Sequence, residues 1–166
     1  MHELFGQVLI PPAVFDELQD EEKPQAVRTW VAEIPSWLKV IPIDLRSDPA
    51  LDFLDEGERE AIALAEQVQA DRILLDEAAA RREATRRNLV IIGTLGVLRE
   101  AARRNLIDLP KTIDRLQTTT FFVKPELIRL LLDEASANDR SDGHRTDPAI
   151  PRKYPTATRI SRIRSS

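Results

Sequence analysis

Short apolar runs alternate with segments of helical periodicity along most of the chain. The runs are bounded by proline, glycine or polar residues, which is typical of buried strands, and they lie at residues 7–10, 37–41, 73–75 and 89–92. Between and after them, apolar residues recur every three or four positions, which predicts helices over residues 12–18, 26–34, 57–68, 77–87, 97–105, 111–117 and 126–135. This alternation favours an α/β fold built on a parallel sheet.

Acidic residues stand at two neighbouring points of this pattern. Glu58 and Glu60 fall in the first turn of the predicted helix over 57–68, where a negative charge suits the helix dipole. Asp76 and Glu77 follow the next buried strand, at the end where open α/β sheets place their ligands. Capping of the following helix by Asp76 is an equally ordinary interpretation. A metal site would need at least one more acid from elsewhere in the chain.

The helix after Asp76 and the turn after the 89–92 strand offer candidate phosphate ligands. Arginines on an exposed helix are more often solvated or paired with acids such as Glu83 than bound to phosphate. The turn Gly93-Thr94-Leu95-Gly96 could let a phosphate approach backbone N–H groups, and tight packing explains its glycines equally well. The arginines concerned are Arg81, Arg82, Arg86 and Arg87.

Composition narrows the chemistry further. A chain of 166 residues, 42% hydrophobic, is expected to form one domain over residues 1–135. No cysteine and only two histidines are present, which disfavours thiolate or histidine metal sites. Carboxylates would therefore hold Mg²⁺ or Mn²⁺. No run of about 18 apolar residues suggests a membrane span, and the absence of a signal-peptide pattern favours the cytoplasm.

The end of the chain differs in charge from the rest. Residues 139–166 contain seven basic and three acidic residues and carry +4, which leaves −8 for residues 1–138. This segment is also rich in serine, threonine and proline. We therefore expect residues 136–166 to form a disordered basic tail. Such tails can bind nucleic acid, although most are merely solvated.

Four segments together resemble the PIN-domain proteins. The nearest group comprises predicted nucleic-acid-binding PIN proteins related to the VapC-type toxins of bacterial toxin-antitoxin pairs. The resemblance spans roughly residues 3–132, and neither GxGxxG, GxxxxGK[ST], HExxH nor GxSxG occurs to suggest another enzyme class. The matching segments are VLIPPAVFDEL (8–18), GEREAIALA (57–65), LLDEAAAR (74–81) and IIGTLGVLREAARRNLI (91–107).

The resemblance implies a three-layer α/β/α fold and a metal-dependent ribonuclease with converging carboxylates. Glu17, rather than Asp16, is the helix acid after the proline pair. Thr94 and Arg81 are the implied substrate-binding residues, and RNA, a small antitoxin protein and a second copy of the chain are the implied partners. The implied catalytic and metal-binding residues are Glu17, Glu60 and Asp76, with Glu58 as a further metal ligand.

One family feature has no counterpart in the sequence. Proteins of this family open with a central strand that carries Asp-x-Ser or Asp-x-Thr, and Met1 comes after that point of the pattern. Without this strand, we expect the strands at 7–10 and 37–41 to be separated from those at 73–75 and 89–92. Unpaired backbone would be exposed on both sides, and one metal ligand would be lost. A catalytically inactive domain that binds RNA or protein, or one without activity, therefore stays open.

Overall fold

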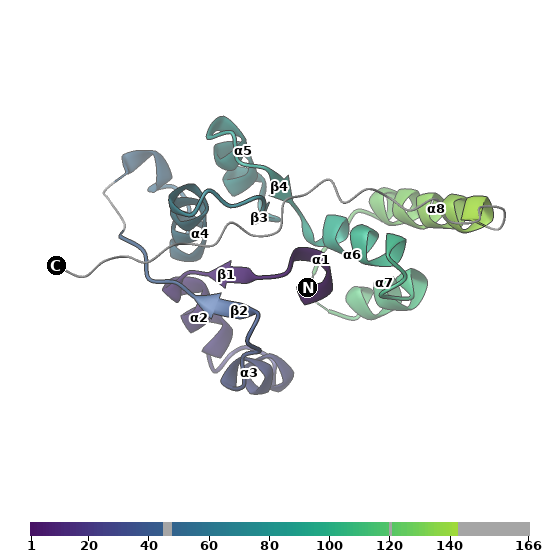
Figure 1. Ribbon diagram of the computed structural model, residues 1–166, viewed down its shortest axis with the longest axis horizontal. Coiled ribbons are helices and arrows are strands. Elements are labelled where there is room, and N and C mark those ends of the chain that lie inside the picture. Colours follow the sequence, from purple (N-terminus) through teal and green to yellow (C-terminus); the bar gives the residue numbers. More distant parts are fainter. Residues whose placement is uncertain (45–47, 120, 143–166) are drawn as a thin grey trace.

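The structure is a computed structural model that describes residues 1–44, 48–119 and 121–142. Figure 1 shows how its helices and strands are arranged. The elements, in chain order, are α1 (His2–Phe5), β1 (Val8–Ile10), α2 (Pro12–Gln19), α3 (Gln25–Ala32), β2 (Leu38–Val40), the 3₁₀ helix η1 (Pro49–Leu51), α4 (Glu56–Gln67), β3 (Ile73–Leu74), α5 (Ala78–Arg86), β4 (Ile91–Ile92), α6 (Thr94–Arg103), α7 (Leu109–Gln117) and α8 (Pro125–Asp142).

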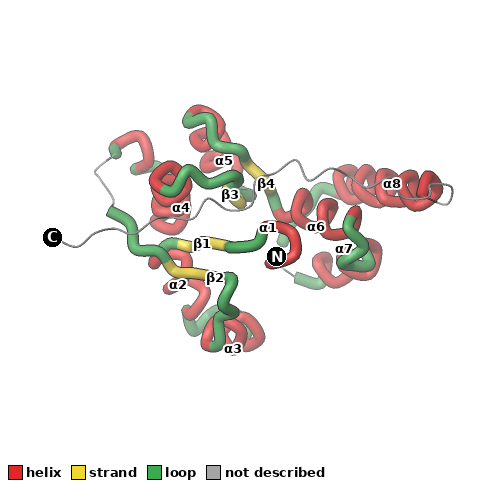
Figure 2. Tube along the Cα trace, viewed as in Figure 1, coloured by secondary structure: helices red, strands yellow, loops and turns green. Residues whose placement is uncertain are grey.

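The strands form two separate parallel pairs. β1 pairs with β2, with Val8 opposite Leu38, and β3 pairs with β4, with Ile73 opposite Ile91. Among the described residues no strand joins the two pairs, and Figures 1 and 2 show β1 and β3 as the inner strands of the four. The predicted α/β class, the parallel direction and the division of the sheet are all confirmed.

Each pair leaves the backbone of its inner strand open on one side. In a parallel ladder, alternate residues direct their N–H and C=O groups to the neighbouring strand. Val8 N–H donates to the Trp37 carbonyl, so the polar groups of Leu9 point away from β2. Ile73 N–H donates toward the β4 side, so those of Leu74 point away from β4. Leu74 is also 47% exposed.

Two apolar clusters hold the helices in place. One lies between α4, β3 and α5, where Ile62 is fully buried, and a fully buried isoleucine stabilises a fold by about 1.5–3 kcal/mol. The other joins α6, α7 and α8 around Ile113. The members of the first cluster are Leu51, Leu54, Ile62, Ala65, Ile73, Leu75, Ala80 and Ala84. α4 also packs against α2, so that one helix contacts elements of both strand pairs.

Several boundaries differ from the sequence prediction. α6 begins at Thr94 rather than at residue 97, because Gly93 already serves as its N-cap. α3 ends at Ala32 rather than at residue 34, and within it Val31 is 2% exposed while Trp30 is 44% exposed. α8 continues to Asp142, past the expected end at residue 135. Residues 143–166 of the predicted tail lie outside the described part.

Candidate functional site

Asp76 is fixed at the start of α6. Its Oδ1 accepts a hydrogen bond from the Thr94 N–H at 2.9 Å, and its Oδ2 accepts one from the Thr94 hydroxyl at 2.5 Å. The carboxylate therefore lies at the N-terminus of α6, where the helix dipole favours a negative charge. The interpretation in which Asp76 caps the next helix is wrong, because Glu77 is the N-cap of α5 and no side chain caps that helix. Asp76 thus links the end of β3 to the start of α6 through two hydrogen bonds.

Arg81 and Gly93 lie against this acid. Arg81 Nη1 donates to the Leu75 carbonyl at 2.9 Å, which holds the guanidinium at the end of β3. A Cβ atom added at Gly93 would lie 2.9 Å from Arg81 Nη1 and 3.0 Å from Asp76 Oδ1. At Gly96 it would lie 2.9 Å from Ile92 Cγ1. The packing interpretation of both glycines is therefore supported by these close approaches.

Gly93→Ala is expected to lower the free energy of unfolding by about 1 kcal/mol, because Arg81 or Asp76 must move to admit the methyl group. Gly57→Ala is the matched control, since its Cβ would meet its nearest neighbour, Val14 Cγ2, at 3.4 Å. Urea unfolding of both variants measures the difference. Equal free energies of unfolding for the two variants would show that the side chains around Gly93 move to admit the methyl group with no loss of stability.

Glu60 and Glu17 lie where α2 packs against α4. Glu60 is 9% exposed, and its Oε2 accepts from the Ala13 N–H in the first turn of α2 at 2.8 Å. Glu17 Oε1 pairs with Lys23 Nζ at 2.7 Å. Its other oxygen, Oε2, lies 3.6 Å from the position of a Cβ on Gly57. Both acids therefore border the first turns of α4.

Glu58 connects this group to the end of β3. Burial raises its pKa, and the negative charges of Asp55 and Glu77 raise the pKa further. Asp55 also accepts the Glu58 N–H at 2.7 Å and so caps α4. Glu77 was recognised in the sequence only as a neighbour of Asp76. The sequence alone does not show that its charge repels that of Glu58, because this depends on how close the starts of α4 and α5 lie in the fold.

The described residues do not gather three acidic or histidine side chains into a metal site. The donor types suit Mg²⁺ or Mn²⁺, which prefer carboxylate oxygens. The geometry falls short of a complete centre, because Glu17 and Glu60 lie where α2 packs against α4 while Asp76 is held at the start of α6. Asp76 and Glu60 each also satisfy a helix N-terminus. The donors are therefore appropriate, but their set is incomplete.

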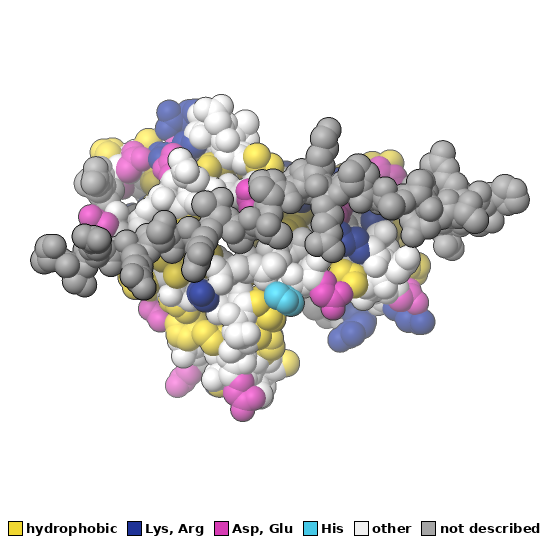
Figure 3. Space-filling model, in the orientation of Figure 1, with side chains coloured by type: hydrophobic (Ala, Val, Ile, Leu, Met, Phe, Trp, Pro, Cys, Tyr) yellow, Lys and Arg dark blue, Asp and Glu magenta, His cyan; other side chains and the backbone are white. Residues whose placement is uncertain are grey.

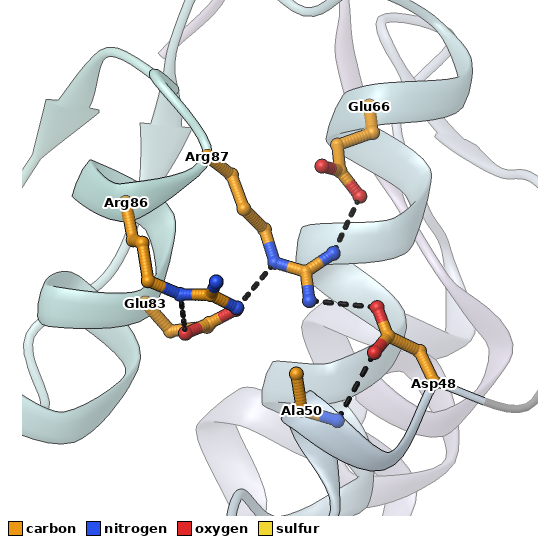
Figure 4. Close-up of polar contacts among 6 residues, drawn as sticks. All are labelled: Asp48, Ala50, Glu66, Glu83, Arg86 and Arg87. Carbon is orange, nitrogen blue, oxygen red and sulfur yellow. Dashed lines mark hydrogen bonds and ion pairs between the residues drawn. The ribbon is translucent and has the colours of Figure 1, made fainter.

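Two of the four arginines identified in the sequence form an ion-pair network instead of facing a phosphate. Figure 4 shows Arg87 between three acids: its guanidinium contacts Glu83 at 2.6 Å, Asp48 at 2.7 Å and Glu66 at 3.0 Å. Arg86 also pairs with Glu83, at 2.6 Å. The interpretation that these arginines pair with acids is confirmed for both. This network ties α5 to the end of α4 and to the segment before η1.

The Glu83 carboxylate makes stability depend on acid pH. The hydrogen bond from Arg86, followed by that from Arg87, lowers the pKa of Glu83 from 4.5 to about 2. A carboxylate with a depressed folded-state pKa stabilises the fold above its unfolded pKa and loses that contribution as pH falls. Stability is thus expected to decrease between about pH 4.5 and pH 2. In thermal unfolding across this range, Glu83→Gln should flatten the decrease, and an unchanged slope would contradict the assignment.

Taken together, the chain is an α/β protein with parallel strands whose acids gather at the ends of strands and the starts of helices. A protein-family model described as a PIN domain matches residues 1–137. The chain therefore belongs to the PIN-domain family, as its sequence resemblance predicted. A search of curated proteins and a search of solved structures gave no match. No described helix is long and apolar enough to cross a membrane.

Proposed function

We propose that the protein is a metal-dependent ribonuclease that hydrolyses RNA phosphodiester bonds. The observation that carries this proposal is the match of residues 1–137 to the PIN-domain model, a family in which nuclease activity is expected. Asp76 supports it locally, because a charged carboxylate lies at the carboxyl end of a parallel strand, where ligands of α/β proteins usually bind.

In this proposal Glu17, Glu60 and Asp76 hold Mg²⁺ or Mn²⁺, and Glu58 is a further ligand. The ion, when bound, would activate a water molecule and stabilise charge on the scissile phosphate. Thr94 orients Asp76 through two hydrogen bonds and lies where it could contact substrate, as does Arg81. Because the donors lie on both halves of the divided sheet, activity requires those halves to act together.

Binding of RNA or a protein partner without catalysis is the second candidate function. The observation that favours it is the absence, within the described ranges, of three acids placed to hold one ion. A binding domain needs no metal, so its RNA affinity should persist in EDTA. Both candidates use the same fold and the same surface, and they differ only in whether the bound RNA is cleaved.

We further propose that the ribonuclease is the toxin of a toxin-antitoxin pair. A PIN ribonuclease of a toxin-antitoxin pair would act in the cytoplasm and be held inactive by a small antitoxin protein, and it could also form a homodimer. Leu127 and Leu130 on α8 are 48% and 57% exposed, which supports a surface that a protein partner could cover. Co-expression with the product of an adjacent gene, followed by co-purification, tests this role.

The experiment that tests the main proposal measures cleavage of a labelled RNA in Mn²⁺, in Mg²⁺ and in EDTA, with RNA binding followed in parallel. We expect cleavage with either metal ion and none in EDTA. Binding that persists in EDTA, with no cleavage under any condition, would support the second candidate instead. If the protein neither cleaves nor binds the RNA, both candidate functions are contradicted.

A further inference from the structure

The four arginines of the α5 region fall into two electrostatic classes. Arg86 and Arg87 are compensated by Glu83, and Arg87 also by Asp48 and Glu66. Arg81 and Arg82 form no ion pair within the part of the chain that the structure describes. The α5 region therefore presents two arginines without ion pairs, of which Arg81 lies near the Asp76 carboxylate, in a protein whose net charge is −4.

These two arginines line a hollow beside Asp76. The hollow has a volume of about 430 Å³, and its opening is wide. Figure 3 shows Lys and Arg side chains next to Asp and Glu side chains at the top of the molecule, near α5. The residues that line the hollow are Asp76, Ala78, Arg81, Arg82, Thr85 and Ile91. It therefore joins positive side chains to the acid that the proposed function uses.

One of the arginines is already oriented. The hydrogen bond from Arg81 Nη1 to the Leu75 carbonyl at 2.9 Å fixes its guanidinium without neutralising its charge. A guanidinium held in this way loses less conformational entropy on binding than a free one. Arg82, the next residue, is exposed and has no such hydrogen bond among the described contacts. The pair thus combines a fixed and a mobile donor.

We propose that Arg82, together with Arg81, binds a backbone phosphate of single-stranded RNA in this hollow, next to the nucleotide that Asp76 would contact. The inference rests on the proposed function in taking RNA as the ligand. The planar fork of arginine matches two phosphate oxygens. In a protein whose net charge is −4, two neighbouring arginines without ion pairs provide a local attraction for a phosphate.

The test measures binding, in EDTA, of a fluorescein-labelled single-stranded RNA of about 12 nucleotides, a length within the usual range for single-strand sites. Fluorescence anisotropy is recorded over a series of salt concentrations for the wild type and two variants. Arg82→Gln is expected to weaken binding about fivefold and to reduce the slope of log affinity against log salt by about 0.7, as for one lost phosphate contact. Inorganic phosphate serves as a competitor.

Arg86→Gln is the matched control, because it removes the same charge from the same helix at a residue already paired with Glu83. We expect it to leave both the affinity and the salt slope unchanged. Equal effects of the two variants, or no effect of Arg82→Gln, would overturn the proposal. Displacement of RNA by millimolar phosphate at constant ionic strength would support it, because the free anion and a backbone phosphate would compete for the same guanidinium groups.

This experiment separates the inference from the proposed function. Arg82-dependent RNA binding without cleavage in Mn²⁺ would support the hollow as a phosphate site and contradict the nuclease. Cleavage in Mn²⁺ with no effect of Arg82→Gln on binding would support the nuclease and contradict the hollow. Circular dichroism of each variant verifies that the fold is retained.

Discussion

Asp76→Asn is expected to reduce Mn²⁺-dependent RNA cleavage at least about 100-fold, because loss of the negative charge removes one of the proposed metal ligands. The asparagine oxygen can still accept the Thr94 N–H, which the aspartate holds at 2.9 Å. The fold should therefore survive while the chemistry fails. Single-turnover cleavage of a labelled RNA measures the rate, and thermal unfolding measures the stability of the same samples.

Thr94→Val is the control for this variant. It keeps the charge of Asp76 and removes only the hydroxyl that donates to Oδ2. We expect a rate loss of only a few fold, since the backbone hydrogen bond still orients the carboxylate. Equal rates for Asp76→Asn and the wild type would exclude Asp76 as a ligand. A loss for Thr94→Val as large as that for Asp76→Asn would assign the effect to orientation instead of charge.

Arg87→Met is expected to lower the free energy of unfolding by about 2 kcal/mol, because it leaves three acids without their shared cation. The Arg87 side chain is 13% exposed and the Glu83 side chain 7%, so water compensates the remaining charges only in part. Methionine retains most of the apolar stem, which limits the effect to the lost ion pairs. Chemical denaturation at neutral pH measures the change.

Arg86→Met is the control for Arg87→Met, because it removes the other arginine that pairs with Glu83. The Arg86 side chain is 64% exposed, and an exposed ion pair contributes little because solvent screens it. We expect a much smaller loss than for Arg87→Met, and an equal loss would contradict the central role of Arg87. At pH 2, where Glu83 approaches neutrality, the effect of Arg87→Met should also shrink.

The sequence predicted the order of the elements well because apolar periodicity reports which face of an element is buried. The start of α4 at its Asp55 cap and the end of α5 before Asn88 both follow local rules of capping and left-handed backbone, and Asn88 indeed has a φ of 60°. The division of the sheet was predicted by comparison with the family pattern rather than from a particular residue. The two helix ends could be predicted because each depends on residues close together in the chain.

The partners of the acids could not be predicted in the same way. Asp76 meets Thr94 across 18 positions, and Glu60 meets Ala13 across 47. Nothing in the local pattern distinguishes an acid that caps a remote helix from one that holds an ion. Burial on α3 shows the same limit, since Val31 is 2% exposed and its neighbour Trp30 is 44% exposed. Tertiary packing decides such cases.

The proposed metal site requires one ion to bind acids that lie on both halves of the sheet. A titration of ¹⁵N-labelled protein with substoichiometric Mn²⁺, followed by the paramagnetic broadening of backbone amide signals in NMR, measures this directly. We expect the amides of Ala13, Gly57 and Thr94, which adjoin Glu60, Glu17 and Asp76, to broaden together before any others. Broadening at only one of these positions, or none at any, would contradict the metal site and the nuclease built on it.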